Sequence, residues 1–348
     1  MSPIPRESQR RAEMLYNYKL YSFKQFRVFS KYAWKTAREV SQSYGGNRLC
    51  VWLDMMWCNI RFGAMHTLDY TLFEFYKKNS RERNTFLTTR RYYKFIKSFD
   101  KDTFFQLSDK PTTYRKYADF IHRDWLLVDE NTSDEDIKAF IVKSTRAIVK
   151  PISSDSGKGV FMASINEGET VSRIIDVKNH GHGLLVEGIV ENCEELKTIN
   201  PSSLNTLRVD VMVKADKSLE IFSVHLRCGC GDTVVDNWGA GGVAYPVDIE
   251  TGIINAPGMD FKRNRYIIHP GTNKVMPGYK IPRYEEACQM AKDIISRDIK
   301  VMYAGLDLAI MPDGIELIEI NFPPAPYFLQ SVDLIGRRKM VENLYMPA

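Results

Sequence analysis

Two short apolar strands joined by a tight turn, at residues 305–321 (GLDLAIMPDGIELIEIN), constrain this chain more than any other segment. A Pro-Asp-Gly connection between two apolar runs predicts a β-hairpin. The polar residues that interrupt the strands are Asp307, Glu319 and Asn321. Glu319 and Asn321 are two positions apart and therefore share one face. Asp307 joins that face if the loop has an odd number of residues, and a three-residue loop would place it directly opposite Glu319.

Two carboxylates and an amide oxygen on one face of a hairpin can hold Mg²⁺, because this hard cation prefers oxygen ligands and accompanies nucleotide phosphates. The hairpin therefore predicts a metal site and, through it, phosphate chemistry. A half-buried hairpin whose acids merely face water is the alternative that the spacing leaves open. Other segments of the chain favour the metal site.

The length and composition describe a globular protein. A chain of 348 residues can hold two or three domains or subdomains around a sizeable core. Apolar residues make up 44% and charged residues 26%. No apolar run predicts a membrane-spanning helix, and residues 1–14 lack the apolar centre of a secretory signal. We therefore expect a cytoplasmic protein whose six scattered cysteines are reduced thiols, with no zinc site.

Basic residues concentrate in the first part of the chain. Residues 1–100 carry 19 Lys and Arg against 8 Asp and Glu, whereas the remainder carries 29 against 35. The basic part is also rich in aromatic residues. Docking of basic helices on the acidic remainder, a membrane-surface contact and a nucleic-acid arm all fit this pattern. No nucleic acid is expected, since no recognition motif accompanies the charge. A peripheral contact with the inner membrane face or with glycan-assembly proteins through residues 1–100 stays open.

The periodicity of apolar residues predicts an α+β catalytic body behind a helical N-terminal region. Residues 7–100 are expected to be helical, with one break at Ser41–Gly46. Two helices are expected late in the chain, at 283–302 and 331–344. A further helix with an acidic first turn is expected at 134–144. The strand candidates are 125–128, 147–149, 160–162, 184–186, 207–213 and 219–224.

A strand that ends in Lys150 and continues into a loop of small residues is a candidate phosphate site. Small residues let backbone N–H groups approach an anion, and Lys150 adds a positive charge. The segment is not a P-loop, because that pattern needs a glycine where Ile152 stands and Ser or Thr where Gly159 stands. An ordinary strand-to-strand turn is the alternative. The candidate binding residues of the loop are Ser153, Ser154, Ser156, Gly157, Lys158 and Gly159.

The end of the strand at 184–186 suits an adenine nucleotide. It continues into a linker in which backbone groups can bind the base edge and a carboxylate can accept hydrogen bonds from ribose hydroxyls. Solvated acids at a strand end are the alternative. The candidate residues are Glu187, Gly188, Ile189, Val190 and Glu194.

Two arginines on successive strands, Arg208 in Asn205-Thr-Leu-Arg208 and Arg227, can grip a phosphate through their rigid fork of donors. They can equally pair with acidic neighbours. The glycine-rich segment 237–243 (NWGAGGV) can approach the phosphates closely or serve as a plain turn.

Taken in chain order, these segments resemble the ATP-grasp superfamily over roughly residues 100–335. The resemblance is greatest to the sugar-transfer-associated ATP-grasp group, both at Asn205–Arg208 and at the upstream Trp52–Gly63. It implies a nucleotide held between two α+β subdomains. The implied domains are a helical region at 1–100, a subdomain with the phosphate loop at 101–186 and a subdomain with the metal site at 187–348. Ser153, Ser154 and Asp155 depart from the family pattern, which is often richer in glycine here.

The resemblance also implies roles for the candidate residues. Lys110 is the candidate for a first phosphate-binding lysine, and Lys150 would neutralise phosphates beside it. Arg208 and Arg227, with Lys150, would be the catalytic residues that stabilise the transferring phosphoryl group. The metal ligands would be Asp307, Glu319 and Asn321, holding two Mg²⁺ ions bridged by Glu319.

The expected function is that of an ATP- and Mg²⁺-dependent carboxylate–amine ligase acting through an acyl phosphate, in polysaccharide or glycoconjugate biosynthesis. Its substrates would be small-molecule or glycan-linked carboxylates and amines. A kinase on the same scaffold, acting on a sugar or lipid-linked hydroxyl, is one alternative. A nucleotide-binding module without turnover is the other.

Overall fold

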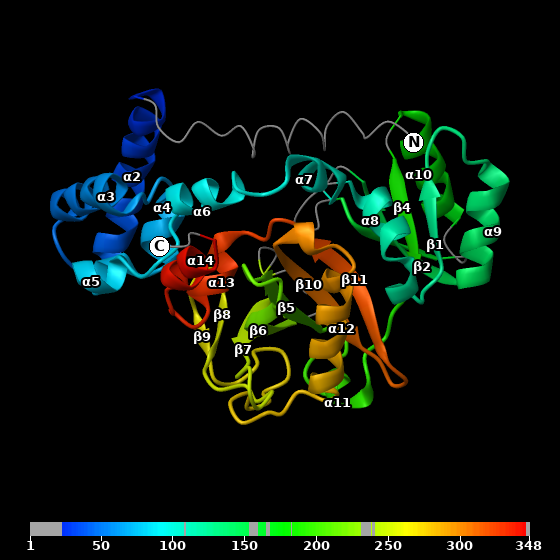
Figure 1. Cartoon of the computed structure of the whole chain (residues 1–348). Helices are drawn as coiled ribbons and strands as arrows, with labels where there is room; N and C mark the ends of the chain where they lie inside the picture. Colours follow the sequence, from blue (N-terminus) through cyan, green and yellow to red (C-terminus); the bar gives the residue numbers. More distant parts are fainter. Residues whose placement is uncertain are drawn as a thin grey trace.

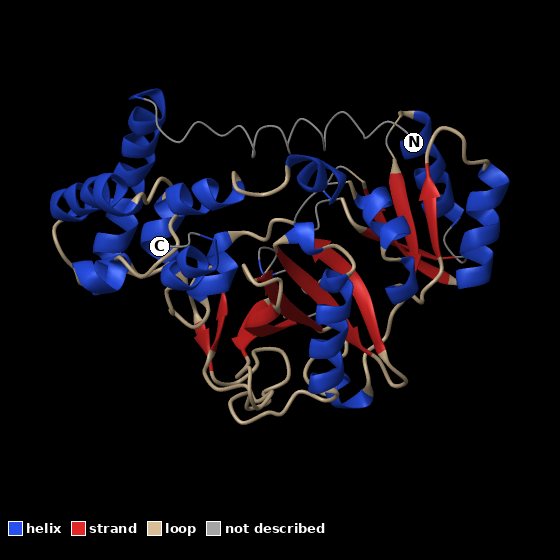
Figure 2. Ribbon diagram, viewed as in Figure 1, coloured by secondary structure: helices blue, strands red, loops and turns tan. Residues whose placement is uncertain are grey.

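The computed structural model describes residues 23–107, 109–152, 159–164, 168–181, 183–230, 238 and 241–345. A helical N-terminal region and a small antiparallel sheet flank a large antiparallel sheet (Figure 1). Helices cover the sheets, as the colouring of Figure 2 shows. The predicted α+β fold behind a helical N-terminal region is confirmed. No helix in the described ranges has the length and apolar content needed to cross a bilayer.

The N-terminal region is built from helices whose core is shared with the rest of the protein, since Ala244, Met259 and Phe328 belong to the same buried cluster. The break predicted at Ser41–Gly46 is confirmed only at its last two residues, because the helix continues to Tyr44 and is ended by Gly45 and Gly46, which adopt φ values of 84° and 94°. The side chain of Asn47 then caps the next helix by accepting a hydrogen bond from the backbone N–H of Leu49. The region is also interrupted at 63–66 and 84–88, which was not predicted. The elements are α2 (Phe23–Tyr44), α3 (Arg48–Phe62), α4 (Thr67–Leu72), η1 (Phe75–Lys77), α5 (Ser80–Arg83), α6 (Thr89–Ile96), α7 (Lys101–Leu107), α8 (Lys110–Lys116) and η2 (Ala118–Phe120).

The small sheet has four antiparallel strands in the order β1-β4-β2-β3. Ile137 and Ile141 of α9 and Ile174 of α10 bury their side chains against it. The strands lie where alternating apolar runs predicted them, although α10 was not predicted. The elements are β1 (Trp125–Val128), α9 (Asp134–Ser144), β2 (Arg146–Pro151), β3 (Phe161–Ser164), α10 (Gly168–Asn179) and β4 (Leu184–Gly188).

The large sheet has seven antiparallel strands in the order β11-β10-β5-β6-β7-β8-β9. Helix α12 packs on one face, and both faces of β5 are buried. On the other face, Phe328 of α13 contacts His225 of β6. The elements are α11 (Glu194–Lys197), β5 (Thr206–Val213), β6 (Leu219–Cys228), β7 (Val243–Pro246), β8 (Gly258–Asp260), β9 (Arg265–Tyr266), α12 (Tyr284–Ser296), η4 (Ile299–Val301), β10 (Tyr303–Ile310), β11 (Ile315–Asn321), α13 (Pro326–Ser331) and α14 (Arg338–Tyr345).

Two predicted helices differ in the structure, and the second of them lies where the C-terminal end packs on the N-terminal region. The helix expected at 283–302 ends at Ser296, and a 3₁₀ turn follows at 299–301. The helix expected at 331–344 is two helices, α13 and α14. Between them Gly336 lies so close to Thr85 that a Cβ would stand 2.2 Å from the threonine hydroxyl. The chain is tied down at the same place by the backbone N–H of Arg338, which donates to the Thr85 carbonyl at 2.9 Å.

The hairpin that carries the predicted metal ligands has the expected pairing but a different loop. Asp307 lies directly opposite Glu319. The three-residue loop, on which the sequence made this direct pairing conditional, does not form. The turn has four residues, because Ile310 pairs with Ile315 and the N–H of Met311 donates to the Gly314 carbonyl at 2.8 Å. Between Glu319 and Leu317, Ile318 forms a β-bulge, and this extra residue restores the register that an even loop would have shifted.

Candidate nucleotide and phosphate site

A cavity of about 370 Å³ lies where the small sheet, the linker after β4 and the large sheet meet. Ile148 and Met162 line it from the small sheet, and Ile318, the bulged residue, lines it from the large sheet. Of the predicted nucleotide-binding residues, Lys150, Glu187, Gly188, Ile189 and Val190 border this cavity. Charged and polar residues, among them Arg146 and Lys197, make up about half of its lining, which suits a charged ligand.

The acid of the linker that lines the cavity is not the one selected from the sequence. Glu194 does not line the cavity. Its side chain is 83% exposed and pairs with Lys197. Glu191, which the sequence reasoning did not select, does line the cavity and lies 3.0 Å from the same lysine. The presence of several acids in this linker was the sequence signal that could have identified Glu191.

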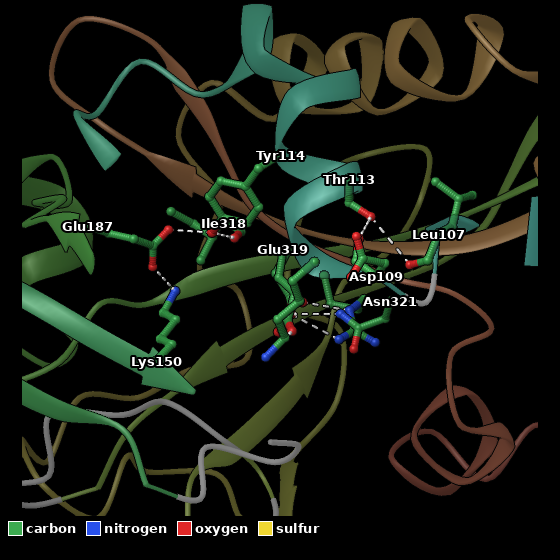
Figure 3. A network of polar contacts seen from close by, with 12 residues as sticks. Leu107, Asp109, Thr113, Tyr114, Lys150, Glu187, Ile318, Glu319 and Asn321 are labelled. Carbon is green, nitrogen blue, oxygen red and sulfur yellow. Dashed lines mark hydrogen bonds and ion pairs between the residues drawn. The ribbon is translucent and has the colours of Figure 1, made fainter. Parts of the chain in front are cut away.

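Glu187 is buried and already has partners. It accepts hydrogen bonds from Tyr114 and from Nε of Arg123 at 2.9 Å, and it pairs with Lys150 (Figure 3). Burial alone would raise the pKa of Glu187, but Lys150 and Arg123 outweigh it and lower that pKa to about 2. The carboxylate therefore remains ionised inside the protein, and both of its oxygens already have partners from the chain.

Arg123 is a buried residue that the sequence reasoning missed. Its guanidinium contacts Glu187 of β4, the Glu316 carboxylate of β11 at 2.6 Å and the Leu317 carbonyl at 2.8 Å. Its side chain is only 5% exposed. A lone arginine before a strand gives no local signal, because its carboxylate partners are 64 and 193 residues away in the chain. We call Tyr114, Arg123, Lys150, Glu187 and Glu316 the Glu187 cluster.

The phosphate loop falls largely outside the described residues. Ser153, Ser154, Ser156, Gly157 and Lys158 cannot be placed. Gly159, which ends the loop, adopts a φ of 74°. The glycine-rich segment 237–243 is described only in part, since Asn237, Gly239 and Ala240 lie outside the described residues. Within it, the indole N–H of Trp238 donates to the Met259 carbonyl at 2.7 Å.

Both predicted catalytic arginines contact Asp307. Arg208 lies directly opposite it on β5, and its Nε and Nη2 reach the two carboxylate oxygens at 2.6 and 3.0 Å. Arg227, on the neighbouring strand, donates to Oδ2 at 2.7 Å, and Asn321 donates to the same oxygen at 3.1 Å. Burial opposes ionisation of Asp307, but the two arginines lower its pKa well below the ordinary value. Both arginines therefore pair with an acid, which was the alternative that the sequence left open.

Two more titratable side chains lie on this face of the large sheet. In the register, Asp210 is opposite Gly305 and His225 is opposite Arg208. Burial raises the pKa of Asp210 to about 6, with Arg208 opposing the change. Burial, with Arg337 and Arg208 nearby, lowers the pKa of His225 to about 3. Neither Oδ2 of Asp210 nor Nε2 of His225 makes a hydrogen bond within the described parts of the chain. We call Arg208, Asp210, His225, Arg227, Asp307 and Asn321 the Asp307 cluster.

Glu319 and Lys110 lie at the open side of this cluster. The Glu319 side chain is 48% exposed, and its carboxylate is 4.0 Å from Nζ of Lys110. Lys110 is the first residue of α8, a helix capped by Asp109, and Tyr114 follows one turn later on the same side. Figure 3 shows Glu319 and Asn321 together beside this helix, with Lys150 and Glu187 to one side. Helix α8 thus contacts both groups of candidate residues.

The residues at the hairpin fit Mg²⁺ by their chemistry. Two carboxylates and an amide from adjacent strands share one face, and among the described residues Glu319 has one long ion-pair contact, to Lys110. The described residues contain no gathering of three or more His, Cys, Asp or Glu that could hold a metal alone. The set therefore depends on the amide oxygen of Asn321 and leaves coordination positions for phosphate oxygens.

Comparison with known protein families decides the identity of this fold. Residues 89–343 match the model of the family described as sugar-transfer associated ATP-grasp. The chain belongs to this family. The match covers both sheets and the helices α6 to α13, and it confirms the resemblance found in the sequence. No curated protein matches the chain.

Solved structures with a similar fold include three ATP-grasp-type enzymes. An N5-carboxyaminoimidazole ribonucleotide synthetase in complex with ADP has 13% identity and a TM-score of 0.42, over 65% of this chain and 47% of that one. The D-alanyl-alanine synthetase A of Vibrio cholerae has 15% identity and a TM-score of 0.44, over 71% and 63%. D-cycloserine synthetase DcsG has 10% identity and a TM-score of 0.46, over 71% and 73%.

The first two enzymes are longer, and this chain spans about half to two thirds of their length. TM-scores below 0.5 are too low to transfer a substrate or a mechanism from any of the three to this ATP-grasp protein.

Proposed function

We propose that this ATP-grasp protein is an ATP- and Mg²⁺-dependent ligase that joins a carboxylate to an amine. The observation that carries the proposal is the hairpin register, which places Asp307, Glu319 and Asn321 on one face beside Arg208 and Arg227. The nucleotide would occupy the cavity bordered by Lys150 and the linker at 188–191. We place the two subdomains that enclose it at 101–186 and 187–348.

The reaction has two steps. A carboxylate oxygen of the substrate attacks the γ-phosphorus of ATP, the bond to the β–γ bridging oxygen breaks, and ADP leaves from an acyl phosphate. The amine then attacks the acyl carbon, the C–O bond to phosphate breaks, and the nitrogen loses a proton as the amide forms. The products are the amide, ADP and inorganic phosphate. Such chemistry depends on positioning and charge stabilisation more than on a protein nucleophile.

Each side chain has a defined task in this proposal. Arg208 and Arg227 would stabilise the charge on the transferring phosphoryl group, since guanidinium forks match phosphate oxygens. Lys150 and Lys110 would neutralise the other phosphates, together with the loop that ends at Gly159. Mg²⁺ held by Asp307, Glu319 and Asn321 would polarise the phosphate oxygens when bound. Glu191, at the cavity wall, is better placed than Glu187 to accept hydrogen bonds from a ribose.

The acceptor is proposed to be a small or glycan-linked carboxylate, and the product a component of a polysaccharide or glycoconjugate. The family description, which associates these proteins with sugar transfer, supports this substrate class. A cytoplasmic location would suit the six free cysteines.

Thermal unfolding with and without Mg·ATP tests the proposal. Wild type should gain about 2.7 kcal/mol of stability at a ligand concentration 100 times Kd, and Glu319→Gln should lose most of this gain. Glu220→Gln is the matched control, because Glu220 is a half-exposed acid of the same sheet whose lysine contact is 3.6 Å long. Release of phosphate that requires both a carboxylate and an amine would then identify a ligase, whereas a phosphorylated acceptor would identify a kinase. The absence of any shift with nucleotide would overturn the proposed site.

A further inference from the structure

Helix α3 is apolar on two opposite faces, and the described parts of the chain cover one of them. Its inner face buries Met55, Met56, Cys58 and Phe62. Its outer face presents Leu49, Leu53, Trp57 and Ile60, whose side chains are between 51% and 55% exposed. The spacing of four, four and three residues places these side chains in one row along the helix. A helix that is apolar all round is ordinarily buried, so the outer row lacks the cover that its composition predicts.

Helix α2 carries a complementary row of positive charge. Its inner face buries Phe29, Ala33, Ala37 and Val40. Its outer face exposes Arg27, Lys31, Lys35 and Arg38 at the same spacing, with the exposed apolar residues Val28 and Tyr32 beside them.

Each row lies on the face of its helix opposite the buried one. Helices α2 and α3 pack on each other and both pack on α4, so their outer faces point away from the protein body. Trp34 and Arg48 join the helices, because the guanidinium lies 4.0 Å from the indole centroid and donates to the Trp34 carbonyl. We call the two rows together the outer surface of α2–α3.

This surface is positive as well as apolar. Between residues 23 and 63 the only acids in the sequence are Glu39 and Asp54. The carboxylate of Asp54 already pairs with Arg83 at 2.6 Å and accepts a hydrogen bond from Tyr70. Glu39 is therefore the one acid of this segment left to oppose seven Lys and Arg residues. A large apolar row beside a basic row is the pattern by which helices lie in the interface of an anionic membrane.

We propose that the outer surface of α2–α3 binds the surface of an anionic lipid bilayer. Leu49, Leu53, Trp57 and Ile60 enter the boundary between headgroups and acyl chains, where Trp is favoured, and the basic row of α2 contacts the lipid phosphates. A second copy of the chain fits this surface less well, because a two-fold contact would bring two basic rows together.

Vesicle flotation of the full-length chain tests the surface. Wild type should float with vesicles that contain about 30% phosphatidylglycerol in phosphatidylcholine and much less with phosphatidylcholine alone, and high salt should weaken binding. Leu53→Glu/Trp57→Glu and, separately, Lys31→Glu/Lys35→Glu should each reduce the affinity at least about tenfold. Ile267→Glu/Val275→Glu is the matched control, because these side chains are 57% and 58% exposed elsewhere on the molecule. This control should bind like wild type.

The possible outcomes distinguish a lipid bilayer from a second copy of the chain as the partner of this surface. Circular dichroism and thermal unfolding of each variant would show that the fold persists, so that lost binding reports the surface itself. Equal binding of wild type and both surface variants would overturn the proposal, as would failure of wild type to bind anionic vesicles. Sedimentation velocity is run in parallel. A dimer that Leu53→Glu/Trp57→Glu dissociates would show that the occupant is a second copy, which also overturns the proposal.

Discussion

Two buried ionic clusters lie beside the proposed nucleotide site, and they differ in how completely their polar atoms are satisfied. In the Glu187 cluster, Arg123 and Lys150 face Glu187 and Glu316 through short contacts, with Tyr114 completing the set. In the Asp307 cluster, Asp307 is fully engaged, but Asp210 and His225 each retain a buried atom without a hydrogen bond in the described structure.

We interpret this difference as one between contacts that hold the fold together, here called the joint, and the proposed metal and phosphate site. Buried polar groups that only support the fold are ordinarily satisfied, because an unsatisfied one costs stability. The Glu187 cluster meets that rule and links β4 to β11. The Asp307 cluster does not, and it opens toward the half-exposed Glu319. Unsatisfied atoms next to an exposed acid are typical of a site that a ligand completes.

The largest effect is expected from breaking the joint. Arg123→Met leaves two carboxylates, Glu187 and Glu316, without their shared buried partner, and should cost about 3–5 kcal/mol of unfolding free energy. Urea denaturation measures the loss. Arg297→Met is the control, because that arginine is 42% exposed and pairs with an acid that is 72% exposed, so its loss should be below about 1 kcal/mol. Similar losses in both variants would remove the distinction between joint and surface pair.

The loss of unfolding free energy at acid pH provides a second test of the difference between the two clusters. The pKa of Glu187 is lowered from 4.5 to about 2 in the folded protein, so its contribution is fully present above about pH 4.5 and is lost as pH falls toward 2. That contribution is roughly 3 kcal/mol. Urea unfolding at several pH values should show a shallower acid limb for Glu187→Gln than for wild type. Parallel limbs in the two proteins would contradict the assignment.

Asp210 should show the opposite sign. Its folded pKa is raised to about 6, so the native state binds a proton that the unfolded state has released, and stability falls as pH rises between about 4 and 6. Asp210→Asn should therefore stabilise the protein by about 2–3 kcal/mol at pH 8 and by little at pH 4. Melting temperatures at the two pH values measure the effect. Destabilisation at pH 8 would show that the ionised acid supports the fold.

The smallest effect is expected from Mg²⁺ alone. Both oxygens of Asp307 are engaged by arginine donors, and Lys110 lies near Glu319, so a dication without phosphates must displace or oppose positive charge. Calorimetric titration with Mg²⁺ should therefore detect only weak binding, whereas Mg²⁺ added with ATP should bind well. Tight binding of Mg²⁺ in the absence of nucleotide would show that the arginines do not hold Asp307 against the metal.

Local patterns in the sequence predicted much of the fold. Trp125–Val128 and Asp134–Ser144 were placed at their exact bounds, since an apolar run and an acidic first turn are local signals. The break between α13 and α14 was not predictable, because it results from contact of Gly336 with a residue far away in the chain.

The candidate site divides in the same way. Spacing predicted the pairing of Asp307 with Glu319 on the condition of an odd loop, whereas the structure reaches the same pairing through an even turn and a bulge at Ile318. The burial of Glu187 and the role of Arg123 depend on β4, β11 and α8 coming together in space. The apolar run before Glu187 was a hint that this acid lies within a buried strand. No pattern near Arg123 pointed to partners on two different sheets.

The bulge at Ile318 shows which features of the hairpin can change without affecting the proposed chemistry. The number of residues between Asp307 and Glu319 decides whether the two acids face each other, but those residues can be divided between turn and strand in more than one way. A four-residue turn with a bulge and a longer or shorter odd turn without one give the same pairing. A residue inserted into the turn at 311–314 should therefore be compensated by removing Ile318. Turn and bulge can thus change together during evolution while the two acids keep their partnership.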